Sequence, residues 1–78
     1  MVTVKFYTRQ GCHLCEIAEA VLRAEQARTP FVLAVFDIDA DPELRELYGL
    51  LAPVTVLPDG EELHYRVEVA RLWAGLSE

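Results

Sequence analysis

The only two cysteines of the chain lie in the segment Cys12-His13-Leu14-Cys15. A thiolate is the form of cysteine that attacks disulfides and binds metals. The start of a helix favours thiolate, because unpaired N–H groups and the helix dipole stabilise negative charge there. An apolar strand-like segment precedes Cys12 and a helical pattern follows it, and Cys15 comes one helical turn later, within reach of Cys12. The pair is therefore predicted to form and open one disulfide.

The same pair is compatible with other interpretations. Two cysteines at this spacing are half of a zinc site, and His13, His64 or another chain would have to supply the remaining ligands of a zinc ion or a shared cluster. Two inert core thiols are a second alternative, and a non-catalytic adaptor module that keeps only its fold is a third. The position between a strand and a helix favours the redox interpretation.

A strand and a helix must hold the pair in place. Apolar and polar side chains alternate over residues 2–7, which is typical of a strand. Residues 8–11 form a polar loop, in which Gly11 gives the backbone freedom directly before Cys12. Apolar residues at helical spacing then predict a helix from His13 to about Arg28.

A second strand follows this helix. Thr29-Pro30 ends the helix, and residues 31–36 are a short continuous apolar run. Such a run is expected of a strand buried on both faces of a parallel sheet. Strand, helix and strand in this length predict a right-handed βαβ unit.

The next segment carries strong helix signals. Asp41 is a good N-cap residue, and Pro42 suits the first helical position. We expect the helix to run to Tyr48, with Gly49 just past its end.

The remaining residues predict a hairpin and a last helix. Residues 52–57 indicate a third strand led by a proline, and a turn at residues 58–60 joins it to a fourth strand over residues 61–66. The apolar stripe that predicts the last helix consists of Val69, Leu72, Trp73 and Leu76.

Length and composition indicate a single domain over residues 1–78. Because 53% of the residues are hydrophobic, the chain can bury one modest core and is not expected to be disordered. The formal net charge of −6 argues against nucleic acid and anionic membranes as partners. The sequence leaves the oligomeric state open, and we take a monomer as the expectation.

The start of the chain and the cysteine count indicate the compartment. Residues 1–7 already have the strand pattern, so we expect no secretory signal. No apolar stretch approaches the roughly 18 residues that a membrane span needs. We therefore expect a cytoplasmic protein, and paired cysteines in that reducing compartment are more often catalytic or metal-binding than structural.

The predicted order of elements resembles the thioredoxin fold in its minimal, glutaredoxin-like form, over nearly the whole chain. The segment from Phe6 to Cys15 resembles the strand and active-site loop of glutaredoxins. Asp37-Ile38-Asp39, Asp41-Pro42-Glu43-Leu44 and Tyr48-Gly49 resemble the second strand and second helix of small bacterial glutaredoxin-like proteins. Ala52-Pro53-Val54 stands where the superfamily carries its cis-proline. The resemblance implies an α/β fold, with a four-stranded mixed sheet and helices on both of its faces.

The resemblance also implies a thiol–disulfide oxidoreductase that acts in cell redox homeostasis. Cys12 would be the nucleophile, and Cys15 the resolving thiol that releases the reduced substrate. Pro53 would be cis, and Ala52 would offer its backbone N–H and C=O to the substrate. The expected substrate is a disulfide-bearing protein or a low-molecular-weight thiol.

Three neighbouring side chains are candidates for binding substrate or tuning the thiolate. Arg9 matches a basic position before the glutaredoxin motif, and its fixed charge would also favour the thiolate. A protonated His13 would have the same effect, with an exposed polar residue of the first helical turn as the alternative. Tyr7 resembles an aromatic wall beside the cysteines, with a core or surface filler as the alternative.

Two segments depart from the glutathione-binding glutaredoxins. Those proteins have Thr-Val before the cis-proline, where this chain has Leu51-Ala52. They also have a Gly-Gly turn and an aspartate before the last helix, where this chain has Tyr65-Arg66-Val67-Glu68. The departures put glutathione as the reductant in doubt, and we expect neither a bound cofactor nor a metal.

Overall fold

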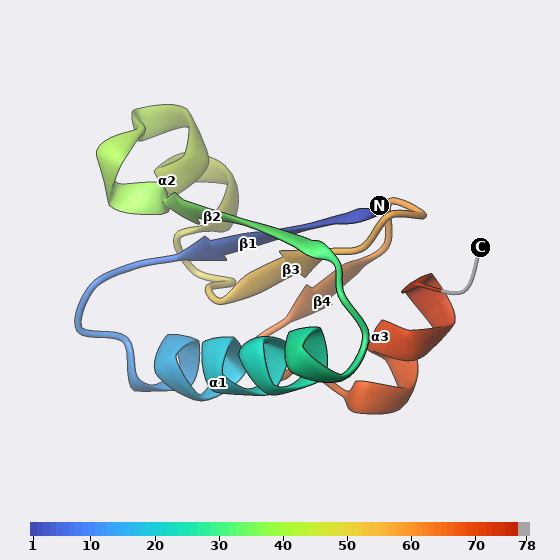
Figure 1. The fold of residues 1–78 in the computed structure, drawn as a ribbon. Coiled ribbons are helices and arrows are strands. Elements are labelled where there is room, and N and C mark those ends of the chain that lie inside the picture. Colours follow the sequence, from blue (N-terminus) through green and yellow to red (C-terminus); the bar gives the residue numbers. More distant parts are fainter. Residues whose placement is uncertain (77–78) are drawn as a thin grey trace.

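The fold is an α/β sandwich around a four-stranded sheet, seen in a computed structural model that describes residues 1–76 (Figure 1). The elements in chain order are β1 (Thr3–Thr8), α1 (His13–Arg28), β2 (Val32–Asp37), the 3-10 helix η1 (Ile38–Ala40), α2 (Pro42–Tyr48), β3 (Val54–Val56), β4 (Glu62–His64) and α3 (Val69–Leu76). The strand order is β2-β1-β3-β4, with parallel and antiparallel pairs. The predicted fold class is confirmed. Within the described residues, no helix combines the length and the apolar character that crossing a membrane requires.

β1 is a central strand and leads the chain into the cysteine segment. It pairs in parallel with β2, from Thr3 opposite Val32 to Thr8 opposite Asp37. On its other side it pairs antiparallel with β3, which forms a further antiparallel pair with β4. Because α1 connects β1 to β2, the predicted βαβ unit is present.

The helices cover both faces of the sheet, with α1 and α3 on one face and α2 on the other (Figure 1). Side chains alternate along a strand, so Val4 and Phe6 of β1 point to the same face. Both are fully buried in one apolar cluster with Ala18 and Leu22 of α1 and Leu72 of α3. This cluster holds α1 against the sheet. The burial of the apolar side of α1 therefore fixes where the helix starts.

The expectation that residues 31–36 are buried on both faces of the sheet is wrong. β2 lies at the edge of the sheet with β1 as its neighbour, and Val32, Val35 and Phe36 are 46%, 42% and 38% exposed. An apolar run does not show whether its strand is central, because that depends on where later strands pair. Here β3 takes the other side of β1, which leaves β2 at the edge.

The helix boundaries follow the sequence signals more closely than the late strands do. The Asp41 side chain accepts a hydrogen bond from the Glu43 N–H at 2.9 Å and caps α2, with Pro42 at its first turn. β3 and β4 are shorter than predicted. β3 begins only after Pro53, which has no N–H to donate, and β4 ends before Tyr65, whose φ of +67° lies outside the extended region.

Candidate active site

The two cysteines lie where β1 passes into α1, as the sequence predicts. Gly11 has a φ of +71°, which favours glycine, and it turns the chain into Cys12. Cys12 is the N-cap of α1, and its Sγ accepts a hydrogen bond from the Cys15 N–H at 3.1 Å. The sulfur thereby satisfies one of the unpaired N–H groups of the first turn. It occupies the place at which a helix start stabilises negative charge.

Cys12 and Cys15 are joined by a disulfide, and their Cα atoms are 5.2 Å apart, a normal separation for such a bond. The two residues differ in access to solvent. Cys15 is 2% exposed, whereas Cys12 is half-buried. An incoming thiol or disulfide can therefore approach Cys12 more readily than Cys15.

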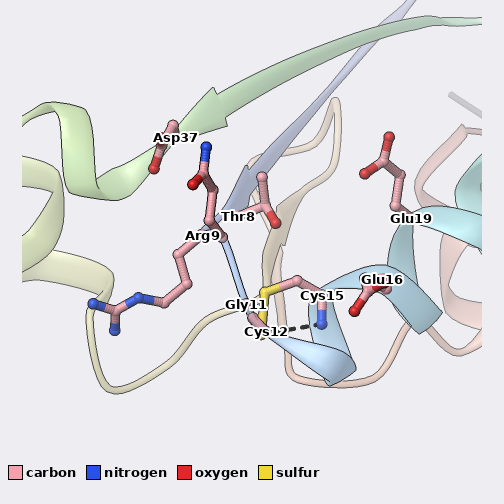
Figure 2. Close-up of a pocket in the computed structure, with 9 residues that line it drawn as sticks. Thr8, Arg9, Gly11, Cys12, Cys15, Glu16, Glu19 and Asp37 are labelled. Carbon is pink, nitrogen blue, oxygen red and sulfur yellow. Dashed lines mark hydrogen bonds between the residues drawn. A yellow bond between two sulfur atoms is a disulfide. The ribbon is translucent and has the colours of Figure 1, made fainter.

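A hollow of about 330 Å³ opens beside the cysteine pair (Figure 2). Six of its nine lining residues are polar or charged. The lining comes from the end of β1 and the loop after it, from the first two turns of α1 and from the end of β2, and it consists of Thr8, Arg9, Gln10, Gly11, Cys12, Cys15, Glu16, Glu19 and Asp37. The hollow has room for a side chain or a small thiol compound.

Arg9 lines this hollow, but its guanidinium is hydrogen-bonded to Asp39 and Gly49. The guanidinium donates two hydrogen bonds to the Asp39 carboxylate, at 2.8 and 3.2 Å, and one to the Gly49 carbonyl at 3.0 Å. Figure 2 shows the side chain running away from the sulfur of the cysteine pair. The sequence indicates the basic residue but not its partner, because Asp39 follows 30 residues later.

Ala52 and Pro53 precede β3, and the peptide bond between them is cis, as the resemblance implies. The register of β1 with β3 places Val54 opposite Tyr7. Pro53 therefore lies beside the end of β1, from which the cysteine loop starts. Its side chain is buried and that of Ala52 is half-buried.

Tyr7 lies in an aromatic stack. Its ring centroid is 5.1 Å from that of Phe36 and 4.8 Å from that of Tyr48. Since Phe6 points to the face that α1 covers, Tyr7 points to the opposite face, where α2 lies. The structure thus places the Tyr7 ring against α2, and not among the residues that line the hollow.

Tyr48, at the end of α2, has a raised pKa. Its hydroxyl donates a hydrogen bond to the Glu62 carboxylate at 3.2 Å. Burial raises the pKa of Tyr48 above the ordinary value of 10.0, and the negative charge of Glu62 raises it further. The folded state therefore favours the protonated phenol.

This shift predicts a pH dependence that can be measured. Because the folded pKa of Tyr48 is raised, its contribution to stability is complete below the unfolded pKa and is lost as the pH rises through the folded pKa. An ultraviolet absorbance titration should show one tyrosine that ionises late, and Tyr48→Phe should remove that step. If Tyr48→Phe still shows the late ionisation step, that step belongs to another tyrosine.

The two histidines lie apart from any cluster of ligands in the described residues. His13 is exposed in the first turn of α1, and His64 on β4 lies 3.0 Å from the Glu62 carboxylate. Across residues 1–76, no group of three or more histidines, cysteines or acidic residues is arranged to hold a metal ion.

The sequence did not predict the backbone conformation of Tyr65 or its contacts beside Pro53. Its φ of +67° is rare for a residue with a bulky side chain. Its hydroxyl donates a hydrogen bond to the Leu50 carbonyl at 2.9 Å, and its N–H donates one to the Pro53 carbonyl at 2.8 Å. Tyr65 also lines a groove of about 130 Å³, together with Leu14 and Ile17 of α1. Nothing in the sequence signals this backbone conformation, since glycine is the residue that normally marks it.

Comparison with known proteins identifies one family and two similar structures. The model of the Glutaredoxin-like domain (DUF836) matches residues 3–77. The chain is 41% identical to protein XcR50 from X. campestris, with 94% of this chain and 93% of that chain covered and a TM-score of 0.67. It is 36% identical to protein Ne2328 from Nitrosomonas europaea, with 92% and 87% covered and a TM-score of 0.76. No curated protein matches the chain.

Proposed function

Because the chain belongs to the glutaredoxin-like domain family, we propose that it is a thiol–disulfide oxidoreductase that cycles Cys12 and Cys15 in cell redox homeostasis. One observation carries the proposal. The sulfur of the half-buried Cys12 caps α1 and is bonded to the sulfur of the buried Cys15. The cap position favours a nucleophilic thiolate, and the partner in the same helical turn supplies the second thiol that a two-electron cycle needs.

In the proposed cycle the Cys12 thiolate attacks one sulfur of a substrate disulfide. A mixed disulfide forms on Cys12, and the first substrate thiolate leaves and takes up a proton. Cys15 then loses its proton and attacks the Cys12 sulfur, which expels the second substrate thiolate. Two electrons pass from the protein to the substrate, and an external thiol reductant returns the protein to the dithiol.

Neighbouring residues are proposed to position the substrate and tune the thiolate. The register of β1 with β3 supports Ala52 and Pro53 as the place where a substrate backbone rests beside the cysteine loop. Arg9 is proposed to bind substrate from the edge of the hollow, with its guanidinium oriented by Asp39. His13, exposed at the helix start, is proposed to favour the thiolate when it is protonated.

The proposed partners are a disulfide-bearing protein or a low-molecular-weight thiol, and not nucleic acid or membrane. The net charge of −6 supports this choice. We propose that the protein works as a monomer in the cytoplasm, without a bound cofactor. A reducing compartment suits a cysteine pair that must be returned to the dithiol in each cycle.

Trapping tests the proposed cycle. In a Cys15→Ser variant the mixed disulfide on Cys12 has no resolving thiol, so it should accumulate when the reduced protein meets a disulfide substrate. Mass spectrometry of the intact protein should detect the adduct, and peptide mapping should locate it on Cys12. A Cys12→Ser, Cys15→Ser double variant is the control and should carry none. A Cys15→Ser protein that stays unmodified would contradict the proposal.

A further inference from the structure

We infer that the redox site selects its substrate by charge, in favour of cationic disulfides and against anionic ones such as oxidised glutathione. The inference rests on the proposed function and adds a substrate class to it. It comes from the charges that line the hollow beside the cysteine pair and from the partners of each of these charges.

Four charged residues line this hollow: the cation Arg9 and the acids Glu16, Glu19 and Asp37. Two of these charges are paired within the fold. Arg9 is paired with Asp39, with a shortest N–O distance of 2.8 Å, and Arg45 also contacts that carboxylate at 3.8 Å. Glu19 is paired with Arg23 at 3.3 Å.

Glu16 and Asp37 remain without a cation. Neither forms an ion pair with any of the described residues. The Asp37 carboxylate accepts a hydrogen bond from the Asp39 N–H at 2.9 Å, which leaves its charge in place. Both side chains are exposed, so they act on a molecule that enters the hollow from solvent. The hollow is therefore net negative.

The two carboxylates come from different sides of the cysteine pair. Glu16 directly follows Cys15 in the first turn of α1, and Asp37 ends β2 opposite Thr8. Figure 2 shows Glu16 next to Cys15 and Asp37 at the end of β2, on the other side of the cysteines in that view. A substrate that reaches Cys12 through the hollow thus passes both carboxylates.

The chemistry of the cycle increases the effect of this charge. The Cys12 thiolate and the departing substrate thiolate each add negative charge beside the carboxylates. An ammonium group on the substrate offsets that charge, whereas a carboxylate adds to it. For two unit charges that act on a substrate charge across about 10 Å of water, the expected preference for a cationic over an anionic disulfide is about tenfold at low ionic strength.

Three small disulfides of different charge test the inference on the reduced full-length protein. Cystamine is cationic, 2-hydroxyethyl disulfide is neutral and oxidised glutathione is anionic. Rates of protein oxidation are followed by acid quenching and mass spectrometry at neutral pH and low salt. Each rate is divided by the rate of dithiothreitol with the same disulfide, which removes the intrinsic reactivity of the disulfide. The normalised rates should fall in the order cystamine, hydroxyethyl disulfide, glutathione.

Salt and a pair of charge variants show whether the hollow causes the preference. At about 1 M KCl the preference should shrink to less than about twofold, because screening acts within about 3 Å. Glu16→Gln combined with Asp37→Asn should also reduce the charge preference to less than about twofold. The amide oxygen of Asp37→Asn can still accept the hydrogen bond from the Asp39 N–H. Glu43→Gln combined with Glu46→Gln on α2 changes the net charge equally and should leave the preference intact.

Several outcomes would overturn the inference. Equal normalised rates at low salt would refute charge selection and leave the proposed function standing. A preference that the Glu16 and Asp37 variant keeps, or that the α2 variant loses equally, would refute the assignment to the hollow. A protein that reacts with none of the three disulfides would overturn the proposed function together with the inference.

Discussion

Replacing Cys12 by serine is expected to abolish turnover of disulfide substrates, down to the rate measured without protein. A serine hydroxyl forms no disulfide and is not ionised at neutral pH, so the first step of the cycle is lost. Cys15 does not replace it, because this residue of the first turn of α1 is only 2% exposed. The measurement is the steady-state reduction of hydroxyethyl disulfide or insulin with dithiothreitol as reductant.

The matched comparison is Cys15→Ser, which keeps the nucleophile and removes only the resolving thiol. This variant should still form one mixed disulfide per chain in a single turnover, whereas Cys12→Ser should form none. Circular dichroism of the two variants in their reduced forms checks that both are folded. Wild-type turnover by Cys12→Ser would contradict the assignment of Cys12 as nucleophile.

Leu22→Ala is expected to lower the free energy of unfolding by about 2–5 kcal/mol. Leu22 is fully buried on α1, where it packs in the apolar cluster with Val4 and Phe6 of β1 and Leu72 of α3. Its truncation removes apolar contacts and leaves a cavity between the helix and the sheet. Since a small domain is stable by only about 5–15 kcal/mol, the loss is a large fraction of the total. Urea unfolding of the reduced protein measures it.

Leu50→Ala makes the same chemical change at the surface. Leu50 is 93% exposed, and its contact with Tyr65 runs through the backbone carbonyl, which the substitution keeps. The expected change in the free energy of unfolding is within about 0.5 kcal/mol. Equal losses for Leu22→Ala and Leu50→Ala would show that the apolar cluster around Leu22 does not carry the stability assigned to it.

The helices are the elements that the sequence predicts most accurately. α1 runs from His13 to Arg28 and α2 from Pro42 to Tyr48, both as predicted. Their signals are local: an apolar stripe at helical spacing for α1, and Asp41 followed by a proline for α2. Such signals act within one or two turns, so distant parts of the chain do not change them.

For the strands, local sequence patterns predict that a strand exists but not its place in the sheet. The run over residues 31–36 predicts a strand correctly, but its burial on both faces is wrong, because β2 lies at the edge of the sheet. The late strands are shortened by two backbone features, the proline before β3 and the left-handed Tyr65 after β4. The position of a strand in a sheet depends on pairing between distant segments.

The sequence by itself determined the chemistry available to this protein, because residue type and helical spacing are local properties. A strand that ends before the loop with Gly11, a helix that starts after Cys12 and a second thiol one turn later are sufficient to predict a cysteine pair that can form a disulfide. Only the tertiary structure decided the charges around that pair. The pairing of β1 with β2 brings Asp39 to Arg9 and Asp37 to the hollow, so that the cation is paired with a carboxylate while Glu16 and Asp37 remain without a cation beside the cysteine pair.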